Sequence, residues 1–152
     1  MRVLLDVNVI LDALLQRAPW RCDAEAILQA DADGRLTCAA TTHSLATVFY
    51  LSRKTIGTAG ARTAVRQFLA ALEILGVDEQ TSRDADAMPG SDFEDNILIA
   101  AAVTHSFDAI VTRSSADFTH SPVPAYESAE LLRRLHAATT PGSGAGPATN
   151  PP

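Results

Sequence analysis

The chain has 152 residues, a net charge of −6 and an apolar fraction of 47%. This length suits one domain, and so large an apolar fraction excludes wholesale disorder. The longest uninterrupted apolar run, Ile97 to Val103, is too short to span a bilayer, and no signal-peptide pattern opens the sequence. The two cysteines, Cys22 and Cys38, make no disulfide framework and fit a reducing compartment. We therefore expect a cytoplasmic protein without a membrane segment.

The charged residues are unevenly distributed along the chain. Between Asp78 and Asp95, seven acids accompany a single arginine. The segment from Gly34 to Leu72 has no acid and contains five basic residues, namely Arg35, Arg53, Lys54, Arg62 and Arg66. A basic surface beside an acidic site suits metal-assisted chemistry on a phosphate polymer. The alternative is that the basic residues form ordinary solvated helix faces.

Strands and helices alternate in the expected order of elements. Strands or short extended segments are predicted from apolar runs over residues 2–5, 36–39, 74–77, 109–112 and 122–125. Helices are predicted from helical spacing over residues 8–15, 45–53, 61–72, 78–88 and 127–138. Two further helices are expected to open at Pro19 and at Ser91, the second with a capping box formed by Ser91 and Glu94. Gly57 and Gly60 separate two neighbouring helices.

This alternation is typical of an α/β fold, a three-layer α/β/α sandwich with a mostly parallel central sheet. We expect the domain to cover residues 1–138. From Thr139 the composition changes to Pro, Gly, Ser, Ala and Thr, which predicts a disordered tail over residues 139–152. In open α/β sheets, ligands bind beyond the carboxyl ends of the strands, so the strand ends are where a site is expected.

The first candidate site residues follow the first strand. Asp6 comes directly after Val3, Leu4 and Leu5, at the carboxyl end of that strand. Asn8 and Asp12 lie four residues apart in the next helix and are expected to share a face. Capping of that helix is the alternative role for Asp6 or Asn8, although it explains an acid at the end of an apolar strand less well.

The second group of candidates lies at the start of the helix near residue 91. Asp92 and Asp95 are three residues apart and therefore on one face. The helix dipole alone accounts for Glu94, because acids are favoured in a first turn. Asp95 adjoins the apolar run, and a buried carboxylate requires a cation or hydrogen-bond donors.

The third group follows the strand at residues 109–112. Thr112 ends this strand, and Asp117 follows it in a short loop. Three places distant in sequence, around Asp6, Asp95 and Asp117, are thus predicted to converge on one edge of the sheet. Oxygen ligands of this kind suit Mg²⁺ or Mn²⁺, whereas the scattered histidines form no pattern typical of a zinc site.

Three segments of the sequence resemble a PIN domain. They are VLLDVNVILD at residues 3–12, DFEDNILIAAA at residues 92–102 and IVTRSSADF at residues 110–118. Their order and spacing match the family over nearly all of the chain up to about Leu135. The resemblance is to small prokaryotic PIN proteins of the VapC type, which include the toxins of toxin–antitoxin pairs.

The resemblance implies a metal-dependent endoribonuclease that hydrolyses RNA phosphodiesters through a carboxylate-bound Mg or Mn ion. The acids that it implies as metal ligands and catalytic residues are Asp6, Asp95, Asp92 and Asp117. It also implies an antitoxin protein that occludes the site, and a homodimer as a further possible assembly. No membrane partner is implied.

Supporting residues are implied by the same resemblance, and two of them depart from the family pattern. Asn8 would orient Asp6, and Thr112 would lie at the rim of the site. Thr47 holds the place where PIN enzymes usually carry a glutamate, and Ser114 the place of an aspartate or asparagine. Asp117 could take the role of the aspartate or asparagine missing at Ser114 only if its loop folds back. A one-metal and a two-metal site both remain open, and we expect weak metal binding.

Two other functions are compatible with the sequence. The missing glutamate at Thr47 favours a catalytically weakened PIN-fold module that binds RNA or protein. A phosphohydrolase that forms an aspartyl phosphate is less favoured, because it requires an aspartate where Asn8 stands and a downstream lysine, whereas Lys54 is the only lysine.

Overall fold

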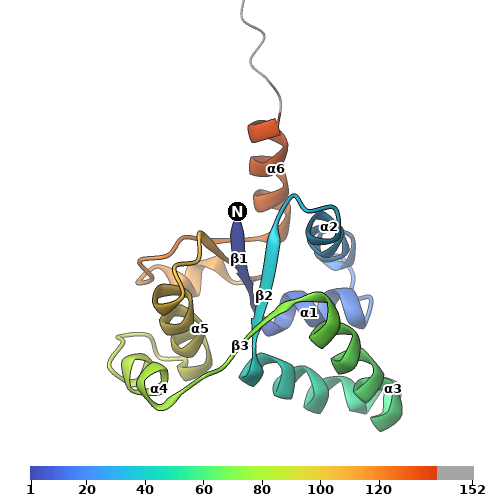
Figure 1. Cartoon of the computed structure of the whole chain (residues 1–152), viewed down its shortest axis with the longest axis horizontal. Helices are drawn as coiled ribbons and strands as arrows, with labels where there is room; N and C mark the ends of the chain where they lie inside the picture. The colour runs from blue at the N-terminus through green and yellow to red at the C-terminus, as the bar shows by residue number, and fades with distance from the viewer. Residues whose placement is uncertain (140–152) are drawn as a thin grey trace, which may run out of the picture.

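A single parallel sheet forms the centre of the molecule, as the computed structural model shows for residues 1–139 (Figure 1). The strands are β1 (Arg2–Leu5), β2 (Thr37–Thr41), β3 (Glu73–Leu75), β4 (Ala109–Val111) and β5 (Ala125–Tyr126). They are ordered β3-β2-β1-β4-β5, and every neighbouring pair is parallel. All carboxyl ends therefore meet at one edge of the sheet, with β1 in the middle.

Helices cover both faces of this sheet. They are α1 (Val7–Leu14), α2 (Arg21–Ala32), α3 (Thr42–Ala71), α4 (Glu79–Asp86), α5 (Phe93–Thr104) and α6 (Ser128–Thr139), with one 3₁₀ turn, η1 (Ser115–Phe118). Side chains alternate along β1, so Val3 and Leu5 pack into a core with α1, α2, α3 and α6. Leu4 faces the other way and packs with α5. The predicted three-layer α/β/α sandwich is confirmed.

The longest helix, α3, is bent at Gly57. This residue has φ +71° and ψ 167°, a conformation that a side chain would strain. The sequence predicts two helices separated here, and the bend at Gly57 confirms the separation, whereas Gly60 lies within the second half. The bend folds the two halves of α3 back toward each other (Figure 1).

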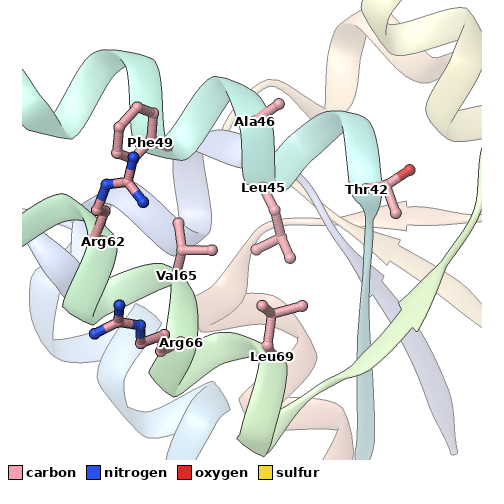
Figure 2. A pocket seen from close by; sticks show the side chains of 8 residues that line it. All are labelled: Thr42, Leu45, Ala46, Phe49, Arg62, Val65, Arg66 and Leu69. Atoms are coloured by element: carbon pink, nitrogen blue, oxygen red, sulfur yellow. The ribbon is translucent and has the colours of Figure 1, made fainter.

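A groove of about 500 Å³ lies between the two halves of α3. Its apolar walls include Leu45 and Phe49 from the first half and Val65 and Leu69 from the second, as Figure 2 shows. Arg62 and Arg66 also line it from the second half. The groove is thus an apolar surface that carries positive charge.

Several helix starts differ from the sequence-based expectation. Helix α5 begins at Phe93, and its N-cap is Asp92, whose carboxylate accepts hydrogen bonds from the amides of Glu94 and Asp95. The predicted capping box of Ser91 and Glu94 is therefore wrong, because the aspartate one residue later makes the capping bonds. The two helices expected to open at Pro19 and at residue 45 begin instead at Arg21 and Thr42.

The early start of α3 has a clear physical cause. Thr41, the last residue of β2, accepts a hydrogen bond of 2.9 Å from the amide of Ser44, so the strand passes directly into a capped helix. At the other end of the chain, α6 ends at Thr139, the residue at which the tail was expected to begin. Residues 140–152 of that predicted tail lie outside the described part of the chain. Within the described part, no helix has the length and apolar character needed to cross a membrane.

Candidate functional site

The pairing of β1 with β4 brings two of the predicted site residues together. Leu5 pairs with Val111, so the next residue of each strand, Asp6 and Thr112, emerges at the same sheet edge. The Thr112 hydroxyl donates a hydrogen bond of 2.9 Å to Asp6 Oδ2, and Asn8 Nδ2 lies 3.5 Å from the same oxygen. Asp6 stands at the N-cap of α1 but makes no capping bond with its side chain. Its carboxylate is therefore held by the side chains of Thr112 and Asn8 rather than by an N-capping bond.

A cleft of about 240 Å³ opens beyond these strand ends. It is bounded by the end of β1, the first half of α3, the start of α5 and the loop after β4. Its lining residues are Asp6, Val7, Asn8, Thr47, Leu51, Asp92, Glu94, Asp95, Thr112, Ser114 and Asp117. The cleft thus unites eight of the nine predicted site residues, all but Asp12.

Asp117 reaches the cleft because its loop turns back on itself. The Asp117 amide donates a hydrogen bond of 2.9 Å to the Ser114 carbonyl, which forms the turn η1. Both Ser114 and Asp117 consequently line the cleft. This is the folding back that the sequence requires if Asp117 is to replace the carboxylate missing at Ser114.

The site is crowded with negative charge. Burial raises the pKa of the Asp6 carboxyl, and the hydrogen bond from Thr112 opposes this shift. Burial also raises the pKa of Asp95, which reaches about 6 with the added repulsion of Asp92, Asp6, Asp117 and Glu94. A divalent cation between these carboxylates would relieve that repulsion.

The side chains of the cleft fit a hard divalent cation in chemistry, without forming a ready-made cage. Carboxylate, amide and hydroxyl oxygens are the ligands that Mg²⁺ and Mn²⁺ prefer. One carboxylate oxygen in the cleft, Glu94 Oε1, is buried and has no hydrogen-bond partner. Among the described residues, however, no three His, Cys, Asp or Glu side chains stand close enough together to hold a metal as placed. Metal binding therefore requires the carboxylates to converge.

Asp12 lies outside the cleft, although we expected it to share a face with Asn8. Its side chain is 1% exposed, and Oδ1 accepts a hydrogen bond of 2.9 Å from Arg113 Nη1. The Arg113 guanidinium in turn lies over the ring of Trp20, 3.7 Å from its centre. Asp12 thus joins α1 to the loop that carries Ser114, rather than facing the cleft itself.

A second hollow of about 240 Å³ adjoins the first and shares three of its acids, Asp92, Asp95 and Asp117. His120 is another of its lining residues, and sequence reasoning missed it. Its Nε2 lies 3.1 Å from Asn96 Oδ1, and Asn96 Nδ2 donates to the Gly90 carbonyl at 2.9 Å. The shared acids therefore lie between two adjoining hollows. A polymeric substrate could occupy both hollows and pass over these acids.

The fold and the acidic cleft define an α/β/α protein with its site at the carboxyl ends of a parallel sheet. The family model for a PIN domain matches residues 2–116 of the chain. The chain therefore belongs to the PIN domain family. No curated protein sequence is significantly similar to it.

Solved structures with this fold include several proteins of toxin–antitoxin pairs. A toxin–antitoxin complex from Klebsiella pneumoniae is 20% identical, with a TM-score of 0.63 over 83% of this chain and 97% of that one. DNA-bound VapBC from Salmonella typhimurium is 15% identical, with a TM-score of 0.63 over 84% and 98%. The sarcin–ricin loop cleaving toxin VapC20 of Mycobacterium tuberculosis is 12% identical, with a TM-score of 0.59 over 71% and 86%. At these identities the likeness establishes the fold.

Proposed function

We propose that this protein is a metal-dependent endoribonuclease that holds Mg²⁺ or Mn²⁺ between the carboxylates of its cleft. Asp6 and Asp95 would be the principal ligands, with Asp92 and Asp117 as the further ones. The observation that carries the proposal is the convergence of Asp6, Asp95 and Asp117 on one cleft from three distant parts of the chain. A bound cation would supply the Lewis acidity that phosphodiester hydrolysis requires.

The side chains around the cleft would position these ligands. Thr112 and Asn8 hold the Oδ2 atom of Asp6 and so fix the direction of its carboxylate. The capping bonds of Asp92 fix the first turn of α5 and so the direction of Asp95. Burial of Asp6 and partial burial of Asp95 strengthen their attraction for a cation, because less water competes with it.

RNA as the substrate is supported by the surface next to the cleft. Lys54 follows Thr47 and Leu51 of the cleft wall at helical spacing, so it extends the same face of α3. Arg53 and Lys54 lie over the ring of Tyr50, at 4.5 and 5.5 Å from its centre. Exposed cations beside an exposed aromatic ring suit phosphates and stacked bases of a single strand. The similar toxin from Mycobacterium tuberculosis, which cleaves the sarcin–ricin loop, agrees with this substrate class.

We also propose an antitoxin as the protein partner. The similar structures include a toxin–antitoxin complex from Klebsiella pneumoniae and DNA-bound VapBC from Salmonella typhimurium. The groove of α3 offers an apolar surface with Arg62 and Arg66 beside it, which suits an amphipathic segment with acidic side chains. A homodimer and a cytoplasmic location stay predictions from the resemblance and the sequence.

A catalytically weakened RNA-binding module is the second candidate function. It is favoured by Thr47 and Ser114, which leave the cleft without two carboxylates that the family pattern has. The lack of a ready-made three-acid cluster among the described residues favours it as well.

Cleavage of a panel of structured RNAs in Mn²⁺ and in Mg²⁺ separates the two functions. We expect the parent to cut, the Asp6→Asn and Asp95→Asn variants to be inactive, and cutting to stop with a chelator. Asp86→Asn is the matched control, because Asp86 is an exposed aspartate of α4 away from the cleft. If the parent binds RNA but never cuts it in either metal, the binding module is the correct function.

A further inference from the structure

The wall of the cleft formed by α3 has no carboxylate of its own. The residues of α3 that line the cleft are Thr47 and Leu51. Neither side chain carries a negative charge that could bind a cation. No acid occurs on α3 at all, since the segment from Gly34 to Leu72 has none. Any negative charge on this side of the cleft must therefore come from another element.

Glu94 on α5 brings a carboxylate to that side. It lines the cleft together with Thr47. Its Oε1 lies 3.7 Å from Nε2 of His43, a residue of α3 one turn before Thr47. Residues four apart on a helix share a face, so His43 and Thr47 present the same face of α3. The carboxylate of Glu94 thus extends from α5 across to the α3 wall.

The environment of this carboxylate is unusual for a glutamate in a first turn. The helix dipole favours an acid at this position but gives no reason for burying one of its oxygens. The Glu94 side chain is 45% exposed, yet its Oε1 atom is shielded from solvent without a hydrogen-bond partner, and the contact with His43 is longer than a hydrogen bond. Leaving a buried polar atom unpaired is costly, and a cation would satisfy it.

We propose that Glu94 supplies the metal-ligating carboxylate that Thr47 cannot provide. This inference rests on the proposed function, because it concerns the same cation in the same cleft. Glu94 joins Asp6, Asp92, Asp95 and Asp117 as a fifth carboxylate, placed on α3's side of the cleft but carried by α5. Its charge also adds to the repulsion felt by Asp95, which agrees with their closeness.

Calorimetric titration of the full chain with Mn²⁺ alone tests the inference without any substrate. In Glu94→Gln the shape of the side chain stays but its charge is lost, and we expect the dissociation constant for Mn²⁺ to rise about tenfold or more. Glu79→Gln is the matched control, because Glu79 is also a first-turn glutamate but pairs with Arg83 at the surface. This control should bind Mn²⁺ like the parent.

A carboxylate returned to α3 provides a second, independent measurement. We expect Thr47→Glu in the Glu94→Gln background to restore Mn²⁺ binding by about tenfold, because the added charge fills the vacated side. In the parent background the same change should improve binding far less, since that side is already occupied by Glu94. Such non-additivity is the mark of two groups that serve one position.

The outcomes separate this inference from the function on which it rests. Mn²⁺ binding by the parent that is unchanged in Glu94→Gln would overturn the role of Glu94 and leave the metal site intact. A lower melting temperature of Glu94→Gln without metal, with parental Mn²⁺ binding, would also overturn it and assign Glu94 to a structural contact with His43. If the parent binds no Mn²⁺ at millimolar concentration, both the inference and the proposed metal site fail.

Discussion

The hydroxyl of Thr112 donates a hydrogen bond of 2.9 Å to Asp6 Oδ2, although the two residues are 106 positions apart in the sequence. The same hydroxyl accepts a bond of 3.1 Å from the amide of Ser114. Thr112 is 1% exposed, so both bonds are shielded from water. One side chain therefore couples the direction of Asp6 to the course of the loop after β4.

Replacing Thr112 with valine should weaken metal binding while it preserves the packing. The variant removes the hydrogen bond that directs Asp6, and loss of such a supporting bond costs about 10- to 100-fold in metal affinity. Thr112→Ser keeps the hydroxyl and should stay within a few fold of the parent. Mn²⁺ titration of the two variants measures the difference. Equal affinities in valine and serine variants would mean that Asp6 needs no help from Thr112.

The buried contact between Asp12 and Arg113 should contribute strongly to stability. In Arg113→Met the carboxyl group of Asp12, which is 1% exposed, loses the cation that it pairs with. Because Arg113 itself is partly exposed, we expect the free energy of unfolding to fall by about 3 kcal/mol, near the lower end for a broken buried pair. Urea denaturation at neutral pH measures this change.

Two further variants show whether the charge of Asp12 is the cause. Asp12→Asn together with Arg113→Met removes both charges, and this pair should recover part of the lost stability. Arg83→Met breaks a pair with Glu79 in which both side chains are largely exposed, and it should change stability little. A double variant no more stable than Arg113→Met would point instead to the lost stacking on Trp20.

The parts of the site that the sequence predicts well are those fixed by sheet topology. Asp6 and Thr112 each follow an apolar strand, and parallel pairing places such positions at one edge. The bend at Gly57 was predictable for a similar reason, since local backbone chemistry decides it.

Other parts of the site depend on how distant side chains meet, which periodicity does not encode. From the sequence, the helix dipole fully accounts for an acid at Glu94 in the first turn of its helix. The sequence therefore gives no sign that Glu94 lines the cleft. His120 follows no spacing rule, and its side chain lines the second hollow while contacting Asn96. The sequence predicts Asp12 on one face with Asn8, but its carboxylate pairs with Arg113 outside the cleft. In each case a single long-range partner decides the role.

Ionisation of Asp95 should make the metal-free protein less stable as the pH rises. Its pKa is about 6 in the folded chain and 3.8 in the reference state, so the folded chain binds the proton more tightly. The resulting stabilisation is present below about pH 4 and is lost as the pH rises through about 6. In Asp95→Asn this dependence disappears. We therefore expect the variant to gain more in melting temperature over the parent at pH 8 than at pH 5.

Thermal unfolding in a chelator, at the two pH values, measures this effect. Asp86→Asn serves as the control, and its melting temperature should track the parent at both. Adding Mn²⁺ at pH 8 should then stabilise the parent more than Asp95→Asn, because the ligand binds only the folded state. A gain in Asp95→Asn that is the same at pH 5 and pH 8 would mean that the pKa of Asp95 is not raised in the folded chain.

The loop before α5 should tolerate no side chain at Gly90. A Cβ built on this residue would overlap Asn96 Oδ1 and the imidazole of His120. Asn96 is 3% exposed and holds the loop by its bond to the Gly90 carbonyl, so it has little room to move. Gly90→Ala should therefore cost about 1–3 kcal/mol of unfolding free energy, the usual penalty for overpacking.

Gly76 provides the matched control for this prediction, because a Cβ there would meet open space. Gly76→Ala should leave the unfolding free energy close to that of the parent. The loop at Gly90 leads directly to Asp92 and Asp95, so Gly90→Ala should also weaken Mn²⁺ binding, whereas Gly76→Ala should not. Urea denaturation and Mn²⁺ titration of both variants measure the two effects. Equal stability of the two alanine variants would show that His120 moves aside freely and that its contact with Asn96 does not hold the acidic cleft.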